Sequence, residues 1–151
     1  MSGRGINVQK LKQYDIFITH AWRNHEDWIR MGELLDGLTG ITWRNFSVPW
    51  HDPAMTPNSV IGQNYIINNL QNQIIPVHGV ILLTGVYAVK SSQKWLDTEL
   101  QFARKHNKPV VGVPAYGKSS IPDEMSILCD QTVHWNASEI IGAIDTLMER
   151  V

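Results

Sequence analysis

Short apolar runs alternate with amphipathic segments along this chain, and that alternation constrains the fold more than any other feature. Three runs rich in β-branched residues predict buried strands at 14–19, 77–83 and 109–113. Two weaker runs, at 41–46 and 132–135, complete a set of five. Strands separated by helices of ordinary length are typical of βαβ units, so the chain predicts a parallel sheet.

The predicted helices lie between these strands and after the last one. Apolar residues recur at helical spacing in four segments, 26–38, 60–74, 95–103 and 136–147. Asn136 and Glu139 have the spacing of a capping box at the start of the last helix. We expect an α/β fold, a flavodoxin-like doubly wound sheet of five parallel strands with helices on both faces. Residues 1–151 are expected to form a single domain.

Composition and charge exclude several classes of protein. With 43% hydrophobic and 18% charged residues, the chain is typical of a globular protein rather than a disordered one. A formal net charge of −1 with scattered Lys and Arg predicts no binding to nucleic acid or to an anionic membrane. The longest apolar run, 80–89, is too short for the ~20 residues of a membrane span.

The polar, Gly-rich segment 1–12 predicts no signal peptide. The single cysteine, Cys129, cannot form an internal disulfide, which favours a reducing compartment and a buried, inert thiol. We therefore expect a soluble cytoplasmic protein.

In doubly wound sheets, ligands bind beyond the carboxyl ends of the strands, where the strand order reverses. That rule selects three segments, at 19–22, 47–53 and 84–87, and the third leads into a helix with Trp95 and Glu99. Positions i and i+4 share a helix face, so the indole can lie beside the carboxylate. Such a pair suits a pocket for a flat, cationic heterocycle. Most Trp–Glu pairs on helices, however, are a core anchor beside a solvated charge.

Other occupants of this architecture are excluded by residues that are missing. A phosphoacceptor domain needs clustered carboxylates where strands end, but those ends read Thr19-His20 and Leu83-Thr84. A Rossmann or flavodoxin phosphate loop needs glycines after the first strand, and 19–25 contains none. The chain also lacks a Walker A loop and a Gly-x-Ser-x-Gly elbow. The six histidines match no zinc-ligand spacing, so we expect no metal site.

Two elements carry a family resemblance. The run Tyr-Asp-Ile-Phe-Ile-Thr-His at 14–20 resembles the first signature box of Toll/interleukin-1 receptor (TIR) domains. Segment 91–100 resembles the family's Ser-x-x-Trp-x-x-x-Glu-Leu element, whose glutamate is catalytic in NAD-cleaving members. The chain is similar to the prokaryotic TIR-like group that includes the NAD-processing subunit of Thoeris antiphage defence. The loop at 43–53 differs from that of animal and plant members.

The resemblance implies an NAD+ glycohydrolase or ADP-ribosyl cyclase that breaks the nicotinamide–ribose bond and makes a cyclic ADP-ribose-type signal. NAD+ is then a substrate, and no cofactor is expected. Nicotinamide is already a cationic leaving group, so a carboxylate facing an oxocarbenium-like transition state suffices. Glu99 is the expected catalytic residue and Trp95 the expected ring platform. The other implied substrate-binding residues are Thr19, His20, Ala21, Trp22, Asn45, Ser47, Trp50 and Asp52.

The implied partners are NAD+, other TIR domains including further copies of this chain, and a separate effector protein that responds to the product. Tyr87 and Trp50 are the expected contact points, whereas Trp28 and Trp43 are interpreted as core. Two alternatives remain open. A TIR interaction module would signal by association alone, with Glu99 as a surface residue. A nucleoside deoxyribosyltransferase uses the same fold with a catalytic glutamate, but the first box gives it no support.

Overall fold

The computed structural model describes residues 13–20, 26–47, 60–87, 90 and 93–149. A five-stranded sheet of order β2-β1-β3-β4-β5 forms its centre, and every neighbouring pair is parallel. The strands are β1 Gln13–Ile18, β2 Thr42–Asn45, β3 Gly79–Leu83, β4 Val110–Val113 and β5 Gln131–Thr132. The helices are α1 Glu26–Asp36, α2 Val60–Ile74, α3 Thr84–Tyr87, α4 Gln93–Lys105, α5 Asp123–Ser126 and α6 Ala137–Met148. The predicted flavodoxin-like fold is confirmed.

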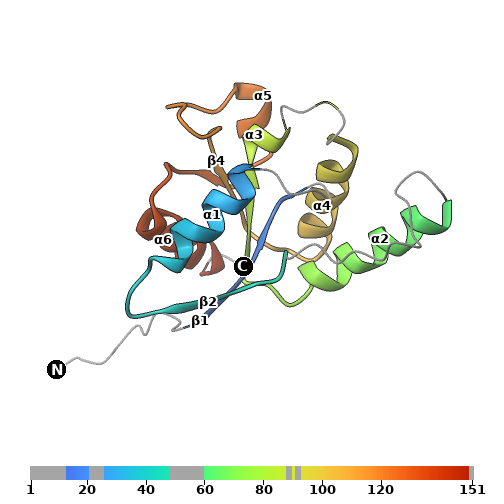
Figure 1. Ribbon diagram of the computed structural model, residues 1–151, viewed down its shortest axis with the longest axis horizontal. Coiled ribbons are helices and arrows are strands. Elements are labelled where there is room, and N and C mark those ends of the chain that lie inside the picture. The colour runs from blue at the N-terminus through green and yellow to red at the C-terminus, as the bar shows by residue number, and fades with distance from the viewer. Residues whose placement is uncertain (1–12, 21–25, 48–59, 88–89, 91–92, 150–151) are drawn as a thin grey trace.

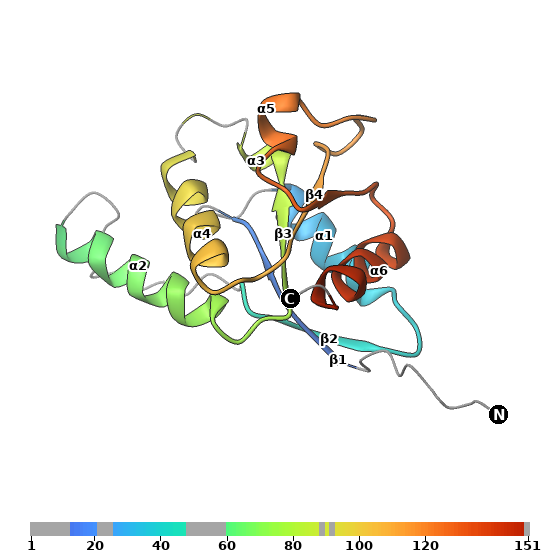
Figure 2. The same ribbon diagram turned by 180° about the vertical axis from the view of Figure 1, so that it is seen from behind.

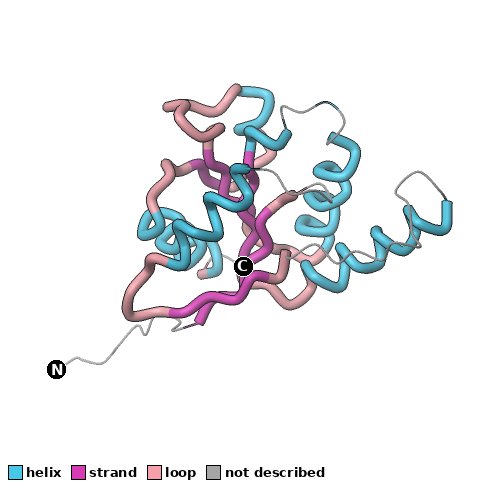
Figure 3. The backbone as a smooth tube through the Cα atoms, viewed as in Figure 1, coloured by secondary structure: helices cyan, strands magenta, loops and turns pink. Residues whose placement is uncertain are grey.

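Helices cover both faces of the sheet. Helices α1 and α6 lie on one face, and α2 and α4 lie on the other (Figures 1 and 2). The tube drawing shows the strands between these two layers (Figure 3). All five residues of β3, and all of β1 after Gln13, are buried. Strands buried on both faces read as continuous apolar runs rather than as alternating patterns, which is why these two were predictable.

The strand order reverses beside β1, and this sets the place of the candidate site. The chain runs from β1 out to β2 at one edge, then returns to β3 on the other side of β1. Thr19 joins the two central strands, because its N–H donates to Ile81 O at 3.0 Å and its Oγ1 accepts from Leu83 N at 3.0 Å. The carboxyl ends of β1 and β3 therefore form the reversal point at which such sheets bind ligands.

Helix α4 carries the two residues of the Trp–Glu pair. Its buried residues, Trp95, Leu96, Glu99, Leu100 and Ala103, recur at helical spacing and face the sheet. The helix ends where Asn107 takes a left-handed conformation, with φ of 57°, which asparagine tolerates better than most residues. The same face that packs α4 on the core thus points Glu99 inward.

Segment 84–87, which follows β3, forms the short helix α3, and Thr84 Oγ1 donates to Val113 O of β4 at 2.8 Å. Two local predictions need correction. Strand β5 is two residues long instead of spanning 132–135. Only half of the predicted capping box forms, with Asn136 Oδ1 accepting from Glu139 N at 2.9 Å. Asn136 N donates to His134 O, so Glu139 Oε1 accepts from His134 N instead.

No helix in the described ranges is long and apolar enough to cross a membrane.

Candidate active site

The Glu99 carboxylate lies inside the protein, with 0% of the residue exposed. It comes from the middle of α4 and meets the end of β1, 79 residues earlier in the chain. The backbone N–H of His20 donates to Glu99 Oε2 at 3.3 Å, and His20 Nε2 lies 3.8 Å from the same oxygen. Glu99 is thus not the solvated surface residue that the interaction-module alternative assumed.

His20 is equally buried, with 0% exposed. Its ring packs against Phe17, at 5.3 Å between centroids, and meets Trp28 edge-on at 6.3 Å and 71°. Because water is excluded from this position, desolvation lowers the pKa of His20 from 6.5 to about 3. The imidazole is therefore neutral at physiological pH.

Trp28 connects this pair to the second strand. Its indole Nε1 donates to Ser47 Oγ at 3.0 Å. Ser47 is buried, and both its N–H and its hydroxyl donate to Asn45 Oδ1, the N–H at 2.9 Å. Four residues predicted as site residues, Glu99, His20, Ser47 and Asn45, thus form one continuous cluster. Trp28 packs on the core, as predicted, but it also contacts both His20 and Ser47, a role that its sequence position did not indicate.

The other predicted site residues fall into two groups. Thr19 lies at the same strand end, and its amide bonds within the sheet. Trp95 is 9% exposed and belongs to the core, with Lys94 Nζ 5.6 Å from its ring centroid. Its role as a substrate platform stays a prediction. Ala21, Trp22, Trp50 and Asp52 lie outside the described residues.

A second buried acid, Asp27, lies near the same carboxyl ends of the strands, and no sequence pattern had pointed to it. Asp27, at the start of α1, accepts from Arg30 Nη1 at 3.1 Å and from Tyr116 N at 3.2 Å. A Cβ at Gly85 would lie 2.5 Å from Asp27 Oδ2, so glycine is needed where α3 passes this carboxylate. Asp27 therefore links helix α1, through Arg30, to the segment that follows β4, through Tyr116.

Tyr87, a predicted contact point for other molecules, is occupied within the chain. Its hydroxyl donates to Asp97 Oδ1 at 3.0 Å. Partial burial, followed by the nearby carboxylate, raises the pKa of the Tyr87 phenol. Its part in association stays a prediction.

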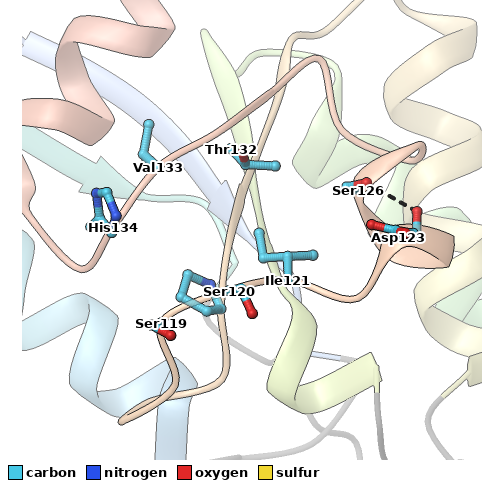
Figure 4. Close-up of a pocket in the computed structure, with 9 residues that line it drawn as sticks. Ser119, Ser120, Ile121, Asp123, Ser126, Thr132, Val133 and His134 are labelled. Carbon is cyan, nitrogen blue, oxygen red and sulfur yellow. Dashed lines mark hydrogen bonds between the residues drawn. The ribbon is translucent and has the colours of Figure 1, made fainter.

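The described surface also has hollows at the far side of the same edge, beyond β4 and β5. One of about 340 Å³ is drawn in Figure 4, where Ser119, Ser120, Thr132 and His134 surround it. Nearby, Tyr116 is 56% exposed, and its ring lies against Arg30 and Trp135. This region offers hydroxyls and an imidazole to solvent, and its Asp123 is exposed rather than buried.

The described residues include no cluster of potential metal ligands, and their single thiol is not activated. Across the described ranges, no three His, Cys, Asp or Glu residues cluster as metal ligands. The Cys129 thiol packs against Gly112 and donates weakly to Met125 O at 3.5 Å. Burial, followed by the charge of Asp130, raises the pKa of Cys129 to about 11, as expected for an inert thiol.

One family of known proteins matches most of the chain. A family described as "Thoeris protein ThsB, TIR-like domain" matches residues 17–120. That range is well over half of the chain and includes His20, Trp28, Ser47 and Glu99. No curated protein matches the chain.

Proposed function

The chain belongs to the TIR-like domain family of the Thoeris protein ThsB, a TIR module of antiphage defence, and we propose that it cleaves the nicotinamide–ribose bond of NAD+. Glu99 is the catalytic carboxylate of this proposal, and the product is a cyclic ADP-ribose-type nucleotide. A separate effector protein responds to that nucleotide, and copies of the chain associate with one another or with other TIR domains.

One observation carries the proposal, which is the complete burial of Glu99 at the carboxyl ends of β1 and β3. Burying a carboxylate is costly, and acids that are buried beside a specific partner occur preferentially at functional sites. This carboxylate also lies where the strand order reverses, the position at which doubly wound sheets bind ligands.

The chemistry needs a negative charge more than it needs a proton donor. When the bond from ribose C1′ to the pyridinium nitrogen breaks, its electron pair leaves with nicotinamide, which becomes neutral. The ribose carbon is left as an oxocarbenium ion, which the Glu99 carboxylate stabilises. Capture by water, with loss of a proton, gives ADP-ribose. Capture by a hydroxyl or ring nitrogen of the same molecule, again with loss of a proton, gives a cyclic isomer.

Access to the carboxylate is the remaining requirement. With 0% of Glu99 exposed, no substrate atom can touch it until the surrounding side chains move. We infer that the resting protein is closed and that cleavage requires opening of the site. The second candidate, a TIR interaction module that signals by association alone, needs no such opening, although it assumed a surface position for Glu99.

The test is incubation of the purified protein with NAD+ over a range of protein concentrations, with products resolved by chromatography and mass spectrometry. Enzyme activity is expected as release of nicotinamide together with ADP-ribose or a cyclic isomer, rising steeply with protein concentration if association opens the site. No NAD+ consumption at any concentration, including in infected-cell extract, would favour the interaction module. Transfer of deoxyribose between nucleobases would favour the deoxyribosyltransferase.

A further inference from the structure

The imidazole of His20 packs beside the proposed catalytic acid, and nothing in the cleavage step described above uses it. Two contacts join the residues, the N–H bond of 3.3 Å to Glu99 Oε2 and the 3.8 Å approach of Nε2 to the same oxygen. The N–H bond ties this oxygen to the end of β1, and the imidazole packs beside the same oxygen, so the carboxylate has little room to turn. A fixed carboxylate plane matters because preorganised charge is what stabilises a transition state.

We propose that His20 is a positioning residue, which orients the Glu99 carboxylate while Trp28 and Ser47 hold the imidazole in place. The proposal rests on the proposed NAD+ cleavage and assigns His20 a role distinct from substrate contact.

The surroundings of the imidazole leave its ring little freedom. Phe17 packs on one side at 5.3 Å, and Trp28 contacts it edge-on, the geometry that aromatic pairs prefer. Trp28 is itself held by the hydrogen bond from Nε1 to Ser47 Oγ, 3.0 Å. Ser47 is buried and lies just after β2. Support for Glu99 therefore runs across the sheet, from β2 through α1 and β1 to α4.

Proton transfer is a poor alternative role for this imidazole. Burial keeps His20 neutral at physiological pH, and nicotinamide needs no proton to leave. A protonated ring beside Glu99 would offset the negative charge on which the oxocarbenium ion depends. A neutral ring can donate Nε2–H toward the carboxylate without this loss, and the 3.8 Å approach can shorten when substrate binds.

The test compares His20→Phe with His20→Gln. Phenylalanine keeps a ring between Phe17 and Trp28 but removes the side-chain donor, whereas glutamine restores an N–H near the position of Nε2. Misplacing a reacting group by about 1 Å can cost roughly 100-fold in rate. We expect His20→Phe to lower kcat for NAD+ cleavage about 10-fold to 100-fold with little change in KM, and His20→Gln to recover much of the loss. The matched control is His134→Phe, at an exposed histidine on the far side of the edge, with kcat within twofold of wild type.

A second readout separates this proposal from the proposed function. The ¹³C resonance of the Glu99 carboxyl, assigned by its absence in Glu99→Gln, reports the environment of the carboxylate without any turnover. We expect it to be a single sharp line in wild type and to move or broaden in His20→Phe but not in His134→Phe. If wild-type protein cleaves no NAD+, the proposed function fails, and this resonance alone decides whether His20 positions Glu99. An unmoved resonance, or a folded His20→Phe with wild-type kcat, overturns the positioning role.

Discussion

Two regions at the same edge of the sheet contrast in almost every physical respect. The closed side, made by Thr19, His20, Trp28, Ser47 and Glu99, lies at the ends of β1, β2 and β3 and is packed with buried polar groups. The open side, made by Ser119, Ser120, Thr132 and His134, lies beyond β4 and β5 around a hollow of about 340 Å³ (Figure 4). Both include residues that closely follow parallel strands, such as His20 after β1 and His134 after β5.

If Glu99 is catalytic, as proposed, a visible hollow is not the best guide to chemistry in this fold. The open side has volume but presents groups that water already solvates. The closed side has no exposed surface at Glu99, yet it holds a carboxylate in a low-dielectric environment, where its charge acts most strongly. It also lies where the strand order reverses, beside β1, whereas the open side lies beyond β4 and β5, away from that reversal.

The largest difference in stability between the two sides is expected for their aromatic residues. Trp95→Ala removes a core indole that is 9% exposed, and we expect it to lower the free energy of unfolding by about 3–5 kcal/mol. Tyr116→Ala, on a ring that is 56% exposed, should cost about 1 kcal/mol. Urea denaturation of both variants measures this, and equal costs would mean that the two sides are packed alike.

Acid should destabilise the protein through the closed side. The pKa of His20 is lowered to about 3 in the folded state, so between pH 6.5 and pH 3 the unfolded chain binds a proton here and the folded chain does not. As the pH is lowered through that window, protonation of the unfolded chain therefore lowers the free energy of unfolding by about 1.4 kcal/mol per pH unit.

The matched pair for this pH effect is His20→Gln and His134→Gln, compared by urea denaturation from pH 7 to pH 4.5. His20→Gln should flatten the dependence of unfolding free energy on pH, while His134→Gln, at an exposed position, should leave it as in wild type. Identical slopes in wild type and His20→Gln would show that the buried imidazole is not the group that titrates.

A smaller effect is expected from the indole hydrogen bonds. Trp28→Phe removes the N–H that donates to the buried Ser47 Oγ, and the unmade bond should cost about 1–3 kcal/mol. Trp43→Phe removes a comparable bond, from Nε1 to Asp36 Oδ1 at 2.8 Å, but in an exposed position. We expect Trp43→Phe to cost about 0.5 kcal/mol. A larger loss of unfolding free energy in Trp43→Phe than in Trp28→Phe would contradict the role of Trp28 in joining His20 to Ser47.

The smallest effect is expected at the thiol. With a pKa of about 11, roughly a thousandth of Cys129 is thiolate at pH 8, so iodoacetamide should label the folded protein hardly at all. The same reagent should label the chain quickly in 8 M urea, which serves as the control. Rapid labelling without denaturant would contradict the packing of Cys129 against Gly112.

The sequence predicted the fold well because local patterns determine it. Strands β1 and β3 are buried on both faces and read as continuous apolar runs, and α4 and α6 have clear apolar faces. The two-residue β5 pairs with β4, and the four-residue α3 is bonded to β4 through Thr84 and Val113, so both depend on contacts with distant segments. Their lengths were therefore not readable from propensity.

The candidate site was predictable only in part, for the same reason. The pairing of Trp95 with Glu99 follows from helical spacing alone. The contact of His20 with Glu99 spans 79 residues, and that of Trp28 with Ser47 spans 19, so neither has a local signal. A tryptophan on a helix that begins soon after the first strand, and a serine after the second strand, were the available hints. Only the sheet order makes them neighbours.

The central claim, that the closed side and not the open side carries the chemistry, is tested most directly by one substitution made at two glutamates. Glu99→Gln and Glu139→Gln remove the same charge, one from the buried cluster and one from a residue that pairs with His134 beside the open hollow. In assays of NAD+ cleavage at equal protein concentration, we expect Glu99→Gln to lose at least about 100-fold in kcat and Glu139→Gln to stay within twofold of wild type. A folded Glu99→Gln as active as wild type, or an equal loss in both variants, would contradict the account.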